Sequence, residues 1–160
     1  MPNYRATITW KRNSENFLDH KYQRLHTWTF ENGLTIDAAA SPHIVPEIYT
    51  DRSLIDPEEA FTASVASCHM LWLLSLAATK KFKVNRYLDQ SEGVLEKNSE
   101  GKLAMTRVIL SPIVLFDAEY APSEYEFINL HREAHEKCFI ANSIKSEIEI
   151  KPEMEIEKGV

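Results

Sequence analysis

Hydrophobic and polar residues alternate near the N-terminus, and this pattern predicts a strand from Tyr4 to Trp10, since alternate side chains of a strand share one face. A second strand is predicted for residues 24–31 and a third for residues 34–39. Asn32-Gly33 between them is typical of a two-residue hairpin turn. The following residues, 40–55, contain two prolines and are predicted to form a long loop.

A long apolar helix is predicted after this loop. Asp56 suits the N-cap, Pro57 the first helical position and Glu59 the third, so that Asp56 and Glu59 form a capping box. From there to about Lys80 the sequence is apolar on nearly every face, and a helix of this kind must be covered on all sides. A single sheet covers only one side. We therefore expect a second copy of the protein to cover the rest, which makes the protein a homodimer.

A hairpin is predicted next, between strands at residues 93–97 and 102–116. Pro112 lies within the second of these strands and predicts a bulge or an edge there, because proline has no backbone N–H to donate. The hairpin places two strands after the long helix.

The C-terminal part predicts a second helix and a last strand. Ser123 and Glu126 form another capping box, and the helix that they begin runs to about Cys138. A strand is predicted for residues 146–151, and the charged residues 152–160 are expected to fray. The order of elements predicts one α+β domain over residues 1–160 with mainly antiparallel pairing.

Composition excludes several function classes. The chain has 160 residues, 44% hydrophobic and 26% charged, which is typical of one globular domain. A net charge of −6 argues against a nucleic-acid partner, which usually requires a basic face. The four glycines are not clustered, which excludes a Walker A loop and a dinucleotide fingerprint. The G-x-S-x-G nucleophile elbow is also absent.

The sequence favours a cytoplasmic protein without a membrane partner. Its N-terminus has no apolar core of a signal peptide. The longest apolar stretch, residues 60–78, contains serine, cysteine and histidine and is followed by two lysines, so a buried helix explains it better than a membrane span. Two cysteines in such a chain are more often catalytic, redox-active or metal-binding than structural.

The cysteines and their neighbouring histidines leave several interpretations open. Cys68 and Cys138 are each predicted on a helix, where a lone cysteine is most often a small core residue. Together with His69 and His135 they would supply four zinc ligands, or His135 would act as a base for a cysteine hydrolase. Adjacent residues point to different helix faces, however. We therefore expect both histidines to be hydrogen-bonded, partly buried imidazoles and expect no metal.

Two segments resemble the OsmC/Ohr superfamily, the osmotically inducible and organic hydroperoxide resistance proteins. The first is Asp56-Pro57-Glu58-Glu59-Ala60-Phe61 with Ala63-Ser64-Val65-Ala66-Ser67-Cys68-His69-Met70, in which Cys68 follows Glu58 by ten positions. The second places Ala134-His135 shortly before Cys138 and Asn142-Ser143 after it. Length and element order agree as well, so the resemblance covers nearly the whole chain.

The resemblance implies a thiol-dependent peroxidase without a cofactor, in an α+β fold intertwined as a homodimer. Cys68 then matches the peroxidatic cysteine, Cys138 the resolving cysteine and Glu58 the active-site glutamate. The family also uses an arginine from the N-terminal strands, for which Arg24 is the best match; the next candidates are Arg107 and Arg52. Phe139 stands where typical members have proline, and this difference indicates a less typical branch.

The chemistry of such a site is consistent with these residue types. A thiolate attacks a peroxide, and the resulting sulfenic acid condenses with a second thiol to a disulfide that an external dithiol reduces. Burial disfavours the thiolate, so a fixed cation such as Arg24 is needed, and Glu58 would orient its guanidinium. A straight helix separates Glu58 from Cys68 by about 15 Å along its axis. We therefore expect a site at the dimer interface.

The substrate is expected to be an organic hydroperoxide, because the site would lie between apolar helices. A non-enzymatic dimer that binds a small apolar ligand in the same place remains the first alternative, and the Cys/His metal-binding or hydrolytic site the second.

Overall fold

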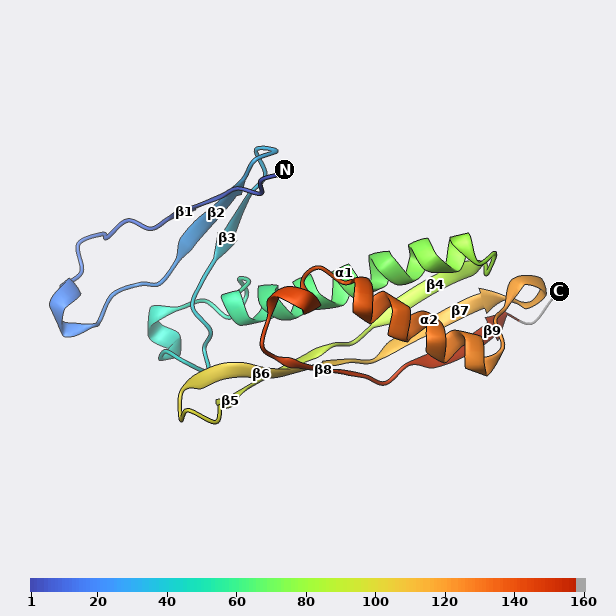
Figure 1. Cartoon of the computed structure of the whole chain (residues 1–160). Coiled ribbons are helices and arrows are strands. Elements are labelled where there is room, and N and C mark those ends of the chain that lie inside the picture. The colour runs from blue at the N-terminus through green and yellow to red at the C-terminus, as the bar shows by residue number, and fades with distance from the viewer. Residues whose placement is uncertain (158–160) are drawn as a thin grey trace. The chain divides into compact units, whose positions relative to one another are not determined.

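The computed structural model describes residues 1–157 and has an α+β fold (Figure 1). The chain forms two compact units, Met1–Ala60 and Phe61–Val160. The strands are β1 (Ala6–Thr9), β2 (His26–Phe30), β3 (Thr35–Ala38), β4 (Val84–Asp89), β5 (Glu92–Lys97), β6 (Leu103–Leu110), β7 (Pro112–Asp117), β8 (Glu147–Ile150) and β9 (Glu153–Glu157). The helices are α1 (Pro57–Thr79) and α2 (Glu124–Lys137), with short 3-10 helices at Phe17–Asp19, Glu47–Tyr49, Ala118–Tyr120 and Ala141–Ser143.

The first unit contains an antiparallel sheet in the order β1-β2-β3. The turn between β2 and β3 is one residue longer than predicted. The Phe30 carbonyl accepts from the Gly33 N–H at 2.9 Å, and the Phe30 N–H donates to the Leu34 carbonyl at 2.8 Å, which leaves three residues in the loop. Gly33 has a φ of 86°, the left-handed conformation that a three-residue hairpin loop requires of its last residue. The prediction of a two-residue turn was therefore wrong.

The capping box at the start of α1 is confirmed. The Glu59 N–H donates to Asp56 Oδ1 at 2.8 Å, and the Asp56 N–H donates to Glu59 Oε2 at 3.4 Å. This role accounts for Glu59 without assigning it any chemistry.

Helix α1 is long and apolar enough to span a membrane by length and composition, a test that the core helix of a soluble protein also passes. Every fourth residue from Val65 to Ala77 is buried within the chain, namely Val65, His69, Leu73 and Ala77. The helix therefore has one face in the core of the chain.

The second unit has two sheets, and strands that follow each other in the chain lie in different sheets. This holds for the pairs β4 and β5, β6 and β7, and β8 and β9. The sheets have the orders β4-β7-β9 and β5-β6-β8, with β7 and β6 as the central strands. Among the described residues, four of the six strand pairings are antiparallel, whereas β6–β8 and β7–β9 are parallel. The predicted α+β class with mainly antiparallel pairing is confirmed.

The predicted long strand at residues 102–116 is two strands. It changes sheets at Ser111, whose N–H donates at 2.8 Å to the side-chain atom Asp89 Oδ1 instead of to a backbone carbonyl. Pro112 begins β7, so the irregularity predicted from this proline lies where the sheets change.

Two strands were missed in the sequence. In β4 a register shift between Val84 and Arg86 interrupts the alternation of buried and exposed side chains by which strands are recognised. Strand β9 occupies residues 153–157, so the prediction that this end frays is wrong for those five residues. Its glutamates pair across the sheet, as Glu155 does with Arg86 at 2.8 Å. Residues 158–160 of the expected tail lie outside the described residues.

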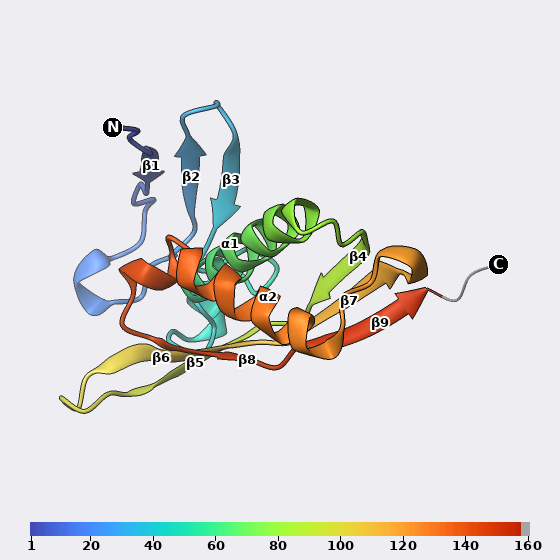
Figure 2. The same cartoon turned by 45° about the vertical axis from the view of Figure 1, so that its right-hand side comes forward.

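Both helices pack on the same side of these strands (Figures 1 and 2). Helix α2 begins at the predicted capping box, in which Ser123 and Glu126 bond each other's backbone. One core cluster joins α1, α2 and β7 through Leu73, Ala77, Val114, Phe116, Phe127, Leu130 and Ala134. A second joins α1 to β6 through Val65, Val108 and Leu110. Helix α1 is thus held against α2 and both sheets.

Helix α1 ends in a left-handed residue other than glycine, which gives a testable prediction. Lys81 has a φ of 68°, and the Phe82 N–H donates to the Ala77 carbonyl at 2.9 Å, as in a Schellman motif. A Cβ in this conformation is strained, so Lys81→Gly should raise the free energy of unfolding by about 0.5–1 kcal/mol in urea titration. Lys81→Ala is the control, because it keeps the Cβ. Equal gains from glycine and alanine would contradict this explanation.

Candidate functional site

Cys68 and Cys138 come together in the second unit, although 70 positions separate them in the sequence. Cys68 lies in the middle of α1 and is partly exposed. Cys138 is the C-cap residue of α2 and is 1% exposed. Both are free thiols, and they lie close enough for the Cys68 thiol to raise the pKa of Cys138. The structure thus brings the two cysteines close together, which the sequence alone could not establish.

The end of α2 positions Cys138. Its backbone N–H donates to the His135 carbonyl at 3.2 Å, and its φ of −68° and ψ of 111° take the chain out of the helix. The chain then turns back, so that the Ala141 N–H donates to Cys138 Sγ at 3.4 Å. The thiol is therefore held by a turn rather than by the interior of a helix.

Burial gives Cys138 a distinct chemical character. The pKa of the Cys138 thiol is raised to about 11, mainly by burial and in addition by the neighbouring Cys68 thiol, against a smaller opposite effect of the Ala141 N–H. At neutral pH Cys138 is consequently protonated. The more accessible thiol and the buried, protonated thiol are not equivalent.

Arg24 and Glu58 belong to the first unit. The Arg24 guanidinium donates to the His20 carbonyl at 3.0 Å and to the Tyr22 carbonyl, and it lies 3.9 Å from the centre of the Tyr22 ring. Glu58 is partly buried in the first turn of α1. Their predicted roles at the cysteines stay predictions.

The two other candidate arginines have carboxylate partners. Arg107 on β6 lies 3.2 Å from Glu149 on β8. Its neighbour Val108 packs against α1, and side chains alternate along a strand, so Arg107 points to the opposite face of the sheet. Arg52 pairs with Glu47 at the surface of the first unit.

A pair of buried histidines joins α1 to α2, the helices that carry the cysteines, and the sequence analysis considered only one of them. His69 Nε2 and His131 Nδ1 are 3.0 Å apart, and the residues are 1% and 3% exposed. The expected hydrogen bond of His69 is confirmed, but the residue is fully rather than partly buried. In the sequence His131 precedes His135 by four positions and Cys138 by seven, and nothing in this spacing indicates a partner on α1.

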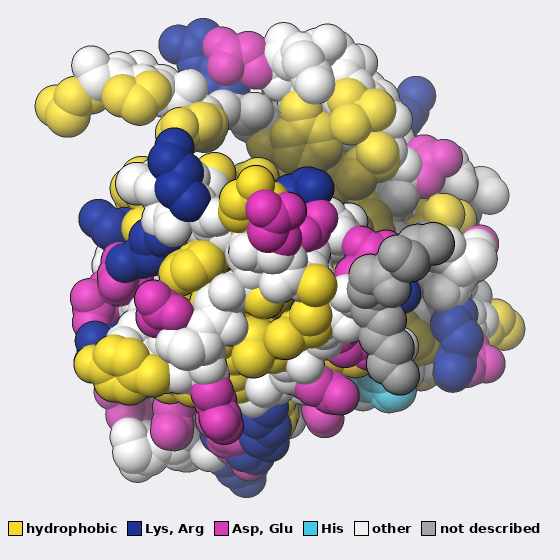
Figure 3. Space-filling view, turned by 90° about the vertical axis from the view of Figure 1, so that its right-hand side faces the viewer, with side chains coloured by type: hydrophobic (Ala, Val, Ile, Leu, Met, Phe, Trp, Pro, Cys, Tyr) yellow, Lys and Arg dark blue, Asp and Glu magenta, His cyan; other side chains and the backbone are white. Residues whose placement is uncertain are grey.

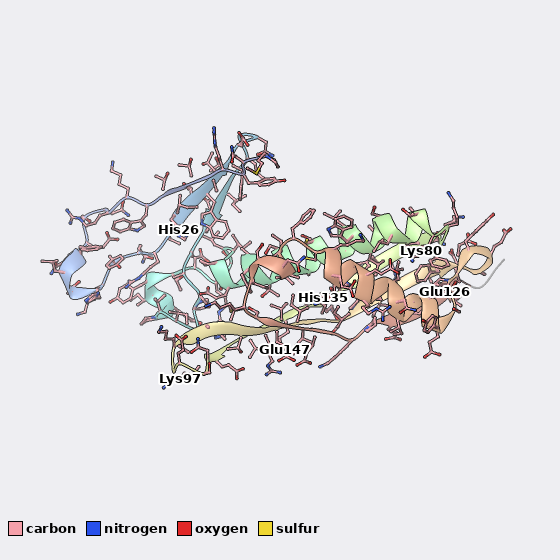
Figure 4. The ribbon with its side chains drawn as sticks, in the orientation of Figure 1. His26, Lys80, Lys97, Glu126, His135 and Glu147 are labelled. Carbon is pink, nitrogen blue, oxygen red and sulfur yellow. The ribbon has the colours of Figure 1, made fainter. Side chains whose placement is uncertain are left out.

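His135 lies on α2 (Figure 4) and is partly buried. Within residues 1–157, no group of three or more His, Cys, Asp and Glu side chains is arranged to hold a metal ion. The four residues considered as zinc ligands therefore do not converge there.

A family model described as OsmC-like protein matches residues 50–153, well over half of the chain. The chain belongs to the OsmC-like family. An OsmC-like protein of unknown function from Vibrio cholerae is 45% identical, and the match covers 98% of this chain and 100% of that one with a TM-score of 0.90. None of the curated proteins compared with the chain matches it.

More distant solved structures with the same fold include organic hydroperoxide resistance proteins. The protein from Elizabethkingia anophelis is 16% identical, with a TM-score of 0.68 and 98% of each chain covered. The protein from Bacillus subtilis is 18% identical, with a TM-score of 0.63, covering 95% of this chain and 97% of that one. At these identities the likeness establishes the fold.

Proposed function

We propose that this OsmC-like protein is a thiol-dependent peroxidase that reduces organic hydroperoxides with Cys68 and Cys138. The observation that carries the proposal is the pair of neighbouring free thiols, one partly exposed on α1 and one buried at the end of α2. An accessible thiol can meet a peroxide, and a buried neighbour is placed to form a disulfide with it. The hydroperoxide resistance proteins with the same fold support this choice of substrate.

The reaction runs in three steps. The Cys68 thiolate attacks one peroxide oxygen, the O–O bond breaks, and the alkoxide leaves and takes up a proton to become an alcohol. Cys138 then attacks the sulfenic sulfur of Cys68, the S–S bond forms, and the hydroxyl group leaves as water with the proton of Cys138. An external dithiol returns two electrons and two protons by thiol–disulfide exchange.

Consumption of hydroperoxide by the purified protein tests this function. With dithiothreitol as the reductant, we expect catalytic loss of cumene hydroperoxide and slower loss of hydrogen peroxide, because Cys68 lies on the apolar helix α1. Loss of peroxide no faster than with dithiothreitol alone would leave the non-enzymatic binding of an apolar ligand as the better proposal.

The proposed active form is a homodimer. The face of α1 opposite its buried residues is exposed and carries mostly small side chains: Ala63, Ser67, Leu71, Ser75 and Ala78. Leu71 is 62% exposed. Small side chains permit close approach of another helix, and exposed apolar surface favours association. Hydrophobic side chains are also exposed among acidic and basic ones on the face drawn in Figure 3.

Sedimentation at micromolar concentration should show a folded dimer, because one chain leaves this face of α1 uncovered. Leu71→Glu should shift the protein toward monomer, since it places a charge in the interface. Glu124→Gln, at an exposed position of α2, is the control and should leave the dimer intact. A folded wild-type monomer would refute the dimer and the interface site together.

Arg24 is the proposed cation that favours the thiolate of Cys68. If so, Arg24→Met should slow alkylation of Cys68 by iodoacetamide at neutral pH by about tenfold, the effect of losing one nearby positive charge. Arg107→Met is the matched control, because Arg107 is held by Glu149 on the face of the sheet away from α1. Unchanged alkylation in Arg24→Met would move this role to another residue.

A further inference from the structure

The buried histidine pair forms a direct polar contact between α1 and α2. His69 Nε2 and His131 Nδ1 are 3.0 Å apart, with ring planes 16° from parallel. Because neither residue is more than 3% exposed, one imidazole must donate to the other inside the core. A hydrogen bond in such surroundings is strongly orienting, since loss of one partner leaves a buried polar group unsatisfied.

The same two helices carry the two cysteines. His69 directly follows Cys68 in α1, and His131 precedes Cys138 by seven residues in α2. Seven residues are close to two helical turns, so His131 and Cys138 share one stripe of α2 about 10 Å apart. Two pairs of polar side chains therefore connect the helices: the imidazoles of His69 and His131, and the thiols of Cys68 and Cys138.

The histidine pair is held more firmly by its surroundings than the cysteine pair. His131 lies within the helix and packs edge-on against Phe127, with ring centres 4.7 Å apart. Cys138 caps the helix and begins a turn. The histidine pair is therefore the fixed contact, and the cysteine is at the end of the helix that can adjust.

Burial keeps the histidine pair neutral at pH 7. Burial lowers the pKa of His69 to about 4 and that of His131 to about 3. The Asp89 carboxylate on β4 opposes this shift at His69, and His135 on α2 reinforces it. Tyr87 faces Asp89 and donates to it at 3.3 Å. The imidazole–imidazole hydrogen bond thus persists at neutral pH.

We propose that His69 and His131 are positioning residues that hold α1 and α2 at the separation at which Cys68 and Cys138 form a disulfide. A disulfide requires Cα atoms about 4.4–6.8 Å apart, a narrow range for two helices whose axes pack at about 8–10 Å. The pair acts on disulfide formation by any oxidant, and only its use in peroxide reduction rests on the proposed function.

Equilibration with glutathione tests this role without any peroxide. The oxidised fraction of the Cys68–Cys138 pair is measured by alkylation and intact mass across a series of glutathione ratios. Asparagine places its amide where histidine has Nδ1, and glutamine where it has Nε2. His131→Asn should therefore keep the equilibrium constant near that of the wild type, and His131→Gln should lower it by about two- to tenfold, the range set by one net hydrogen bond. For His69, glutamine is the retaining variant and asparagine the displacing one.

Each outcome decides the proposal. Equal constants for the retaining and displacing variants at both positions would overturn it, even if the displacing variants unfold more easily. A wild type that forms no Cys68–Cys138 disulfide in glutathione would overturn it as well. A wild type that forms the disulfide but consumes no peroxide would refute the peroxidase function alone, and the comparison of variants would still establish the positioning role. If a variant at one position does not fold, the pair at the other position gives the same comparison.

Discussion

Cys68→Ser should abolish hydroperoxide reduction completely, because a serine hydroxyl does not ionise near neutral pH and is not a nucleophile toward peroxide oxygen. Cys138→Ser should instead permit one turnover per site, since Cys138 acts only after a sulfenic acid exists at Cys68. The two substitutions change the same atom type in two neighbouring side chains. A different outcome for each therefore separates the roles of the two residues, and each variant serves as the matched control for the other.

Intact mass after exposure to excess cumene hydroperoxide measures the difference. The wild type should lose two hydrogen atoms as the disulfide forms. Cys138→Ser should gain oxygen at Cys68, first one atom and then more as the sulfenic acid over-oxidises. Cys68→Ser should stay unmodified, because Cys138 is buried and its raised pKa of about 11 keeps it a thiol.

Two results would contradict this assignment. Oxygen that adds first at Cys138 would reverse the roles of the two cysteines. Turnover of Cys138→Ser as fast as that of the wild type with a small thiol would show that Cys138 is not needed for resolution.

The sequence predicted the parts of the fold that follow local rules. Both capping boxes lie where Asp56-Glu59 and Ser123-Glu126 placed them, because a cap is a contact between residues three apart. It missed β4, where a bulge after Val84 breaks the alternation, and β9, whose glutamates resemble a solvated tail until their cross-strand partners are known. Such features depend on strands distant in the sequence.

The candidate site was predictable in a similar, partial way. Cys68 and Cys138 were recognised through the motifs around them, whereas their contact is a tertiary event that spacing does not encode. His131 was overlooked as a partner of His69 for the same reason. Whether Arg24 and Glu58 reach the cysteines depends on how chain segments and subunits assemble, and no local sequence pattern specifies that assembly.

Acid should destabilise the protein through the same histidine pair. The unfolded chain binds protons at His69 and His131 near pH 6.5, but burial lowers their folded pKa values to about 4 and about 3. Below pH 6.5 the unfolded state therefore holds more protons than the folded state, so the free energy of unfolding falls as the pH falls. Between pH 6.5 and 5 the two residues together should remove about 3 kcal/mol, and the loss should continue until the folded pKa values are reached.

Urea titrations at a series of pH values measure this loss. The window above pH 5 is informative, because the paired carboxylates with lowered pKa values, such as Asp117, Glu126 and Glu149, affect stability only at lower pH. The double variant His69→Gln/His131→Asn keeps polar atoms at both positions but removes both titrating groups. Its stability should change much less between pH 6.5 and 5 than that of the wild type. His43→Gln, at an exposed position, is the control and should retain the wild-type slope. A slope that is the same in the double variant and the wild type would mean that the buried pair does not cause the acid sensitivity.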